Sequence, residues 1–177
     1  MIRLFAAIGI PEHICDALPM PDGEIAGVNW IPDENFHVTL RFIGEVDNAK
    51  ARDIDDVLSA VRAPRFEMAL HGLDTFGGKS PHALYAGLRP CPPLNHLHQK
   101  IDAALTRLGC PSDRTKYTPH VTLARLRNAP EHKLAAFIQA HNLFECDPFT
   151  VTEFGLYSSE LHPNGSVYML ERSYPLN

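Results

Sequence analysis

The strongest constraint on the fold of this chain is a tetrapeptide that occurs twice. Residues 37–40 and residues 120–123 both read His-Val-Thr-Leu. With all residue types equally frequent, a match of this kind has odds of about one in ten in such a chain. Each copy lies in a strand-like run, follows a Pro-containing approach and has an Arg soon after it. The repeat therefore predicts two equivalent strands in one fold.

The alternation of side chains along a strand decides which residues of each copy share a face. His37 and Thr39 project to one face, and the apolar residues between and after them project to the core. The second copy places His120 and Thr122 together in the same way. Two such strands at one cleft would surround a phosphate with two imidazoles and two hydroxyls.

Two histidines in opposite protonation states suit the in-line cleavage of a phosphodiester without a metal ion. One imidazole removes a proton from the attacking water, and the other protonates the departing oxygen. A lone strand histidine is more often held by backbone groups, but the duplication and the paired hydroxyls favour catalysis. We therefore predict His37 and His120 as catalytic residues, Thr39 and Thr122 as phosphate-binding residues, and no metal or cofactor.

Arginine is the expected clamp for phosphate, because it is always charged and presents a planar fork of donors. Arg41 lies four residues after His37, so an unbroken strand keeps it on the catalytic face. Arg125 lies five residues after His120, which is the opposite parity. It needs a β-bulge, a strand end or its own length to reach the site.

The remaining pattern predicts an α+β domain with helices packed on mostly antiparallel sheets. Helical spacing predicts a helix that Asn48 caps, a second from Leu94 to Leu108 that stops at Gly109, and a weaker third from Pro130. Short runs rich in β-branched or aromatic residues predict strands over 3–10, 36–43, 66–73, 83–88, 120–126, 149–157 and 167–172.

Length and charge limit the class of protein. The 177 residues suit one domain, residues 1–177, and the net charge of −5 opposes binding along a whole nucleic acid. The apolar opening ends at Pro11, short of a membrane span or a leader. The four cysteines never form CxxC. We expect a reduced, cytoplasmic, monomeric protein without a membrane partner.

Three other features of the sequence are expected to have structural rather than catalytic roles. His96 and His98 do not share a helix face and are expected at the surface rather than on a metal. The Gly-rich segment 76–82 lacks the P-loop pattern and is expected to connect a hairpin, although it could line the cleft. Aromatic residues beside the strands could stack a base, but such residues more often join the core: Trp30, Phe42 and Tyr117.

The chain resembles the two-histidine (2H) phosphoesterase superfamily, and within it the RNA 2′,3′-cyclic phosphodiesterases, historically called 2′-5′ RNA ligases. The resemblance rests on segments spread through the chain: Arg3-Leu4-Phe5-Ala6-Ala7-Ile8, Trp30-Ile31-Pro32, Asn35 to Glu45, and Pro119 to Arg125. It implies a pseudo-duplicated fold of two lobes around a central cleft between the two HxT strands. Arg125 matches the arginine of the longer second motif of the family.

The resemblance implies an enzyme that hydrolyses 2′,3′-cyclic phosphate ends of RNA or nucleotides to a 2′-phosphate. It also implies weak joining or cleavage of 2′-5′ linkages. Two alternatives stay open from the residues. The first is a module that binds RNA ends without catalysis, and the second is a phosphodiesterase of a cyclic-phosphate metabolite.

Overall fold

A computed structural model describes residues 1–177 as one strongly curved sheet with helices outside it. The main sheet has eight strands in the order β10-β9-β1-β3-β7-β6-β5, with β2 paired to β7, and β4 pairs with β8 in a separate ribbon. All strand pairs are antiparallel. The strands are β1 Ile2–Gly9, β2 Val28–Trp30, β3 His37–Val46, β4 Phe66–Met68, β5 Leu70–Phe76, β6 Ala83–Leu88, β7 His120–Leu126, β8 Phe149–Val151, β9 Glu153–His162 and β10 Gly165–Pro175.

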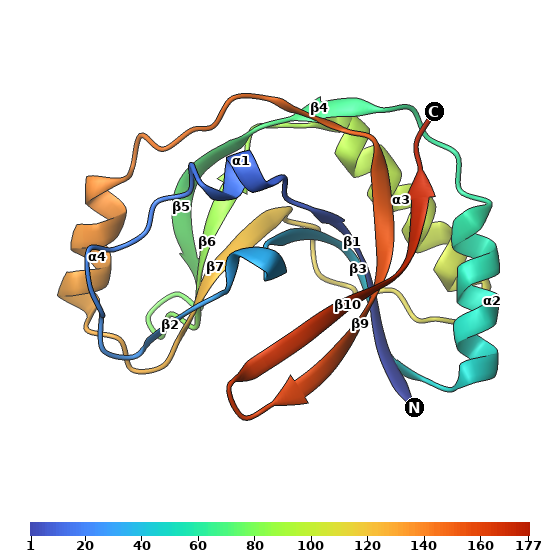
Figure 1. Ribbon diagram of the computed structural model, residues 1–177, viewed down its shortest axis with the longest axis horizontal. Helices are drawn as coiled ribbons and strands as arrows, with labels where there is room; N and C mark the ends of the chain where they lie inside the picture. Colours follow the sequence, from blue (N-terminus) through green and yellow to red (C-terminus); the bar gives the residue numbers. More distant parts are fainter.

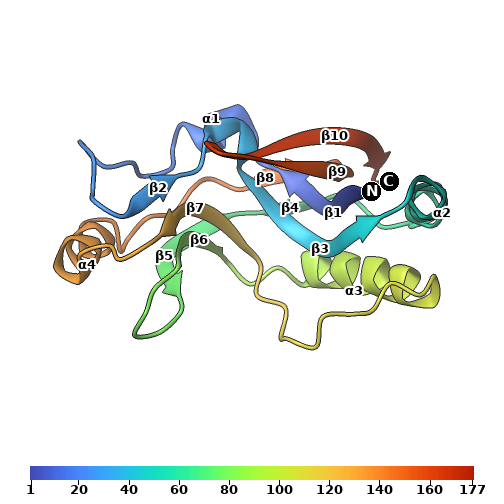
Figure 2. The ribbon, with the colours of Figure 1, turned by 90° about the horizontal axis from the view of Figure 1, so that it is seen from below.

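The helices pack against the outside of the curved sheet. Figure 1 shows α4 at one end of the molecule and α2 with α3 at the other, while the β9–β10 hairpin extends from the middle. Figure 2 shows α3 running beneath β3. The helices are α1 Glu12–Cys15, α2 Asn48–Ser59, α3 Pro92–Arg107 and α4 Glu131–Ala140, and Asp33–Asn35 form one 3-10 turn. The predicted α+β class is confirmed.

The two strands that carry the repeat meet at the centre of the sheet. Val38 of β3 pairs with Val121 of β7, and this seam divides the sheet into two lobes. The alternate residues Val38, Leu40, Val121 and Leu123 are fully or almost fully buried. They belong to one core cluster of 35 buried residues that spans both lobes, so the opposite face of the seam is left for polar side chains.

Several sequence predictions need correction in their boundaries. The run 66–73 is two strands, because β4 pairs with β8 whereas β5 pairs with β6. The run 149–157 is divided in the same way between β8 and β9. Asp47, rather than Asn48, caps α2, and its side chain accepts a hydrogen bond from the Lys50 backbone N–H at 2.8 Å. Three short elements, α1, β2 and the 3-10 turn, were not predicted.

Two further findings concern membrane-spanning helices and the cysteines. No helix is both long enough and apolar enough to cross a membrane. All four cysteines are free thiols.

Candidate active site

The central seam brings both His-x-Thr pairs to one face of the sheet. The pairing of Val38 with Val121 places His37 beside Thr122 and Thr39 beside His120 in the antiparallel register. All four side chains are half-buried, while their neighbours along each strand are buried. The structure therefore assembles two imidazoles and two hydroxyls in one place.

Each imidazole is oriented by the same local contact. Nδ1 of His37 lies 2.6 Å from the carbonyl oxygen of Asn35, and Nδ1 of His120 lies 2.7 Å from that of Thr118. A carbonyl only accepts, so Nδ1 carries the proton and donates it. Nε2 is then the available nitrogen of both rings, and it is the atom through which each ring can exchange protons.

Burial changes the protonation of both rings. It lowers the pKa of His37 below its ordinary value, and the charge of a protonated His120 would lower it further; the hydrogen bond to Asn35 acts against these effects. Burial likewise lowers the pKa of His120, against the opposing hydrogen bond to Thr118. Both free imidazoles are therefore neutral at neutral pH, and two protons in the cleft repel each other.

Four aromatic rings enclose the two histidines. The centroids of the Phe5 and Tyr168 rings lie 5.0 and 5.3 Å from that of His37. On the other side, the Phe76 and Tyr85 centroids lie 4.7 and 5.3 Å from that of His120. Phe5, Tyr85 and Tyr168 come from neighbouring strands, so only the strand order could reveal them. Phe76 begins the Gly-rich connection, which is the expected hairpin loop, and it lines the His120 hollow, as the sequence allowed for this segment.

The cleft consists of two hollows that meet at shared residues. The His37 hollow, about 310 Å³, is also lined by Thr39, Phe42 and Arg125. The His120 hollow, about 690 Å³, is also lined by Thr39 and Phe42. Thr122 lies on the same face of the sheet but lines neither hollow. A phosphodiester at the junction would reach both imidazoles.

Two matching β-bulges decide which residue reaches the cleft after each repeat. The pairing of β6 with β7 skips Leu123, so Leu123 and Ala124 are both buried and Arg125 is turned to the cleft. The pairing of β1 with β3 skips Leu40 in the same way, so Phe42 occupies the corresponding place. The parity change that Arg125 requires is present.

Arg41 borders the His120 hollow, but the bulge turns its guanidinium into the interior, so the expectation that it clamps phosphate on the catalytic face is wrong. Arg41 is 6% exposed, and its Nε donates to the Asp102 carboxylate at 2.7 Å. Its other nitrogens donate to the backbone carbonyls of Phe42, Cys110 and Pro111. The guanidinium is therefore occupied in holding the segment after α3, which forms a wall of the His120 hollow.

Tyr117 and Trp30, two of the three aromatic residues considered for base stacking, pack against other side chains of the protein instead. Tyr117 stacks on His98 with 3.7 Å between ring centroids, and its hydroxyl donates to the Thr39 carbonyl at 2.9 Å. His98 is half-buried and bonded through Nδ1 to the Leu40 carbonyl at 2.7 Å, so the expected surface position is wrong. Trp30 packs edge-on against Phe137. Phe42, in contrast, is 51% exposed in the cleft.

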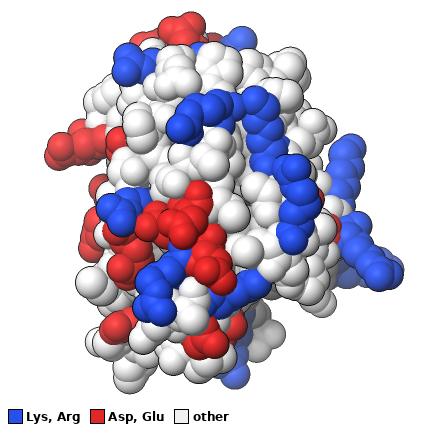
Figure 3. Space-filling view, turned by 90° about the vertical axis from the view of Figure 1, so that its right-hand side faces the viewer, with Lys and Arg blue, Asp and Glu red and all other residues white.

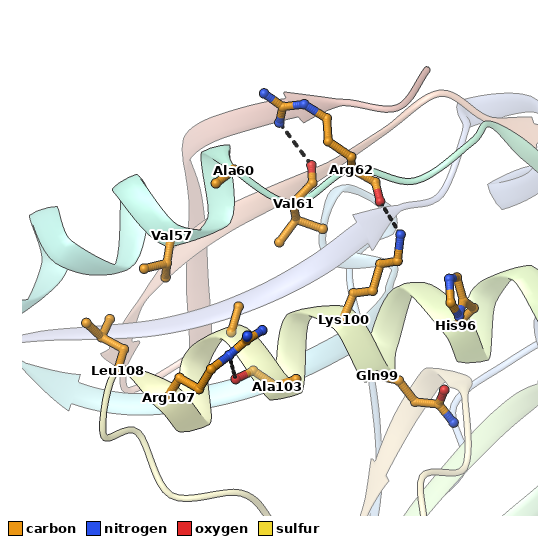
Figure 4. Close-up of a pocket in the computed structure, with 11 residues that line it drawn as sticks. Val57, Ala60, Val61, Arg62, His96, Gln99, Lys100, Ala103, Arg107 and Leu108 are labelled. Carbon is orange, nitrogen blue, oxygen red and sulfur yellow. Dashed lines mark hydrogen bonds between the residues drawn. The ribbon is translucent and has the colours of Figure 1, made fainter.

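A separate hollow of about 670 Å³ lies between α2 and α3, and neither His37 nor His120 lines it (Figure 4). Its floor is apolar, and its cations Arg62, Lys100 and Arg107 donate to nearby backbone carbonyls. Figure 3 shows basic and acidic side chains sharing this side of the molecule. The hollow has neither the paired acid–base groups nor the free cation of the seam, so the seam is the candidate active site.

Known proteins are similar to this chain in sequence and fold. The profile of the 2′-5′ RNA ligase superfamily matches residues 26–163. An RNA 2′,3′-cyclic phosphodiesterase of Aeropyrum pernix is 33% identical over 143 residues, covering 78% of this chain and 80% of that protein. One of Methanocaldococcus jannaschii is 29% identical over 174 residues, covering 94% and 96%. The structure of Escherichia coli LigT complexed with 3′-AMP has a TM-score of 0.78 and 26% identity, covering 99% and 98%.

The fold and the paired His-x-Thr strands define a phosphoesterase of the two-histidine class. The chain belongs to the 2′-5′ RNA ligase superfamily.

Proposed function

We propose that this enzyme hydrolyses the 2′,3′-cyclic phosphate at RNA ends or on nucleotides and leaves a 2′-phosphate. The observation that carries the proposal is the pair of imidazoles at the seam, each with Nδ1 on a carbonyl two residues before it. This geometry leaves two Nε2 atoms for proton transfer at one phosphate. The names of the relatives agree with the reaction.

The reaction needs one proton to leave the water and one to reach the leaving oxygen. In our assignment, neutral His120 accepts the proton as the water oxygen bonds to phosphorus. Protonated His37 donates its proton to O3′ as the P–O3′ bond breaks. The two histidines then hold exchanged protonation states, and solvent restores them. The mutual repulsion of two protons in the cleft disfavours the doubly protonated state, so one histidine stays neutral while the other carries a proton.

The residues around the histidines bind different parts of the substrate. Thr39 and Thr122 donate hydroxyl hydrogen bonds to the non-bridging oxygens, and Arg125 neutralises their charge. The exposed ring of Phe42 offers a face for the terminal base. Arg125 lines the His37 hollow and not the His120 hollow, so the phosphate oxygens that it neutralises lie toward the His37 side of the junction. We assign His37 as the acid and His120 as the base, and a substrate with an activated leaving group tests this assignment.

The decisive experiment gives the purified protein 2′,3′-cyclic nucleotides and RNA oligonucleotides with cyclic-phosphate ends, with and without EDTA. We expect turnover in both conditions, and phosphorus NMR should identify the 2′-phosphate. His37→Ala and His120→Ala should each lower kcat by about a hundredfold or more, whereas His132→Ala on the exposed face of α4 should not. Near-normal turnover by either folded seam variant would refute the two-histidine mechanism.

The same variants test the individual roles. A phosphodiester with a p-nitrophenolate leaving group needs no acid, so it should rescue His37→Ala and leave His120→Ala defective. Rescue of His120→Ala alone would exchange the roles. RNA-end binding without turnover would favour the binding module, and turnover of only a cyclic-phosphate metabolite would favour the other alternative. Weak 2′-5′ joining, a single domain over 1–177, a monomer and a cytoplasmic location remain predictions.

A further inference from the structure

Besides Arg125, the His37 hollow contains a second arginine that the reaction does not use. Arg3 lines this hollow together with Ser159, Leu161, Ser166 and Tyr168. Alternation along β1 places Arg3 on the same face as Phe5, whose ring contacts His37. The position lies about 7 Å farther along β1 than Phe5, which is within the reach of one nucleotide.

The Arg3 guanidinium has no anionic partner in the protein. None of the ion pairs within 4.0 Å includes Arg3 or Arg125. Glu45 is the register partner of Arg3 on β3, but it too forms no ion pair with it. The guanidinium carbon instead lies 5.3 Å from the centroid of the Phe42 ring. This contact positions the charge beside the proposed base platform without neutralising it.

The neighbouring strands add polar groups around this charge. The pairing of Leu4 with Ser158 places Ser159 beside Arg3 on the cleft face, and the pairing of Ser159 with Tyr168 continues the row onto β10. A hydrogen bond of 3.0 Å from the Asn35 amide to the Ser166 carbonyl ties the β9–β10 hairpin to the segment before His37. The hairpin is thus fixed in place as a wall of the hollow.

We propose that Arg3, with Ser159, binds the internucleotide phosphate next to the terminal cyclic phosphate. This inference rests on the proposed function and specifies its substrate: an RNA chain of at least two nucleotides is preferred over a mononucleotide. The terminal phosphate lies at the histidines with Arg125, the terminal base lies on Phe42, and the preceding phosphate lies at Arg3. Two cations confined to one hollow explain how a chain of net charge −5 recognises RNA at its end only.

The test compares CpC with a 2′,3′-cyclic phosphate end against cytidine 2′,3′-cyclic phosphate, which lacks the second phosphate. Arg3→Gln should lower kcat/KM for the dinucleotide by about tenfold, as expected for a partly buried charge-assisted hydrogen bond. It should change kcat/KM for the mononucleotide by less than about twofold. Arg3→Lys should retain part of the preference. Arg107→Gln on α3 removes the same charge outside the cleft and should change neither substrate.

A substrate modification completes a double-mutant cycle. An uncharged methylphosphonate in place of the internucleotide phosphate should lower kcat/KM of the unmodified enzyme by about tenfold. The same substitution should have little effect on kcat/KM of Arg3→Gln, which already lacks the interaction. Equal losses on both substrates, no loss on either, or additive effects in the cycle would overturn the inference while mononucleotide turnover still supports the proposed function. Failure of the unmodified enzyme on both substrates would instead refute the function. Thermal melts of each variant confirm that it is folded.

Discussion

Replacing Arg41 or Arg125 with methionine should have different effects: the first should lower stability and the second should weaken phosphate binding. Arg41 supports the fold, whereas Arg125 faces the substrate. Arg41 is 6% exposed and donates to Asp102 and three backbone carbonyls. Arg125 is exposed and has no ion-pair partner. Arg41→Met keeps the unbranched apolar stem of the side chain but removes every donor.

The size of the Arg41 effect follows from what the substitution leaves behind. Removing one partner of a fully buried pair costs about 3–5 kcal/mol. The Asp102 side chain is 27% exposed and also accepts from Ser112 at 2.9 Å, so the lower limit of about 3 kcal/mol applies. For a domain of this size, that loss lowers Tm by about 6–12 °C. Arg125→Met should change the free energy of unfolding by less than about 0.5 kcal/mol.

Thermal and urea unfolding at pH 7 measure the first effect, and competitive inhibition by inorganic phosphate below the Tm of each variant measures the second. We expect Arg41→Met to lose stability with a nearly unchanged phosphate inhibition constant, and Arg125→Met to bind phosphate about tenfold more weakly. Arg41→Met combined with Asp102→Leu should recover part of the stability, because no carboxylate is then left unpaired. An Arg41→Met protein of normal Tm that binds phosphate weakly would refute this interpretation of the bulge.

Three further predictions concern the protonation of the histidines and the hydrogen bond of Tyr117. Because burial lowers the pKa of both His37 and His120, kcat/KM should follow a bell whose maximum lies below pH 6.5, with NMR titration of the rings as the direct check. Near and below pH 6.5, the folded state also binds fewer protons than the unfolded state. The free energy of unfolding should therefore be full above pH 6.5 and decline as pH falls through the folded pKa values of the two histidines. The decline should be smaller in the variant that combines His37→Ala with His120→Ala. Tyr117→Phe keeps the stacking on His98 but removes the bond to the Thr39 carbonyl. It should cost about 1 kcal/mol of stability in urea unfolding, and an unchanged urea midpoint would argue against this role.

The parts of the fold that the sequence predicted are those set by local periodicity. Strand alternation placed His37 with Thr39 and His120 with Thr122, and helical spacing located α2 and α3 because their apolar residues face one core. The division of 66–73 at Ala69 was not predictable in this way. Its two halves have similar composition, and only their partners, β8 and β6, separate them.

The position of Arg41 depended on a contact that local sequence does not contain. An arginine in the fifth place of a strand motif is ordinarily an exposed residue. Here Asp102, which is 61 positions away in the chain, and the carbonyls after α3 satisfy its donors inside the protein. The second repeat contains the clue, because Leu123 and Ala124 are consecutive apolar residues that a regular alternation does not produce. Aligning the repeats places Arg41 with Ala124 and Phe42 with Arg125.

That alignment separates what the two repeats share from what they do not. Both histidines donate through Nδ1 to a carbonyl two residues earlier, so the proton-transfer groups of the two lobes are equivalent. Five positions after each histidine the lobes differ, because an aromatic ring faces the cleft in one and a guanidinium faces it in the other. A cleft with two equivalent halves would accept a phosphodiester in two opposite orientations. Phe42 and Arg125 bind different parts of a nucleotide, so they select one orientation, and that orientation determines which histidine meets the leaving oxygen.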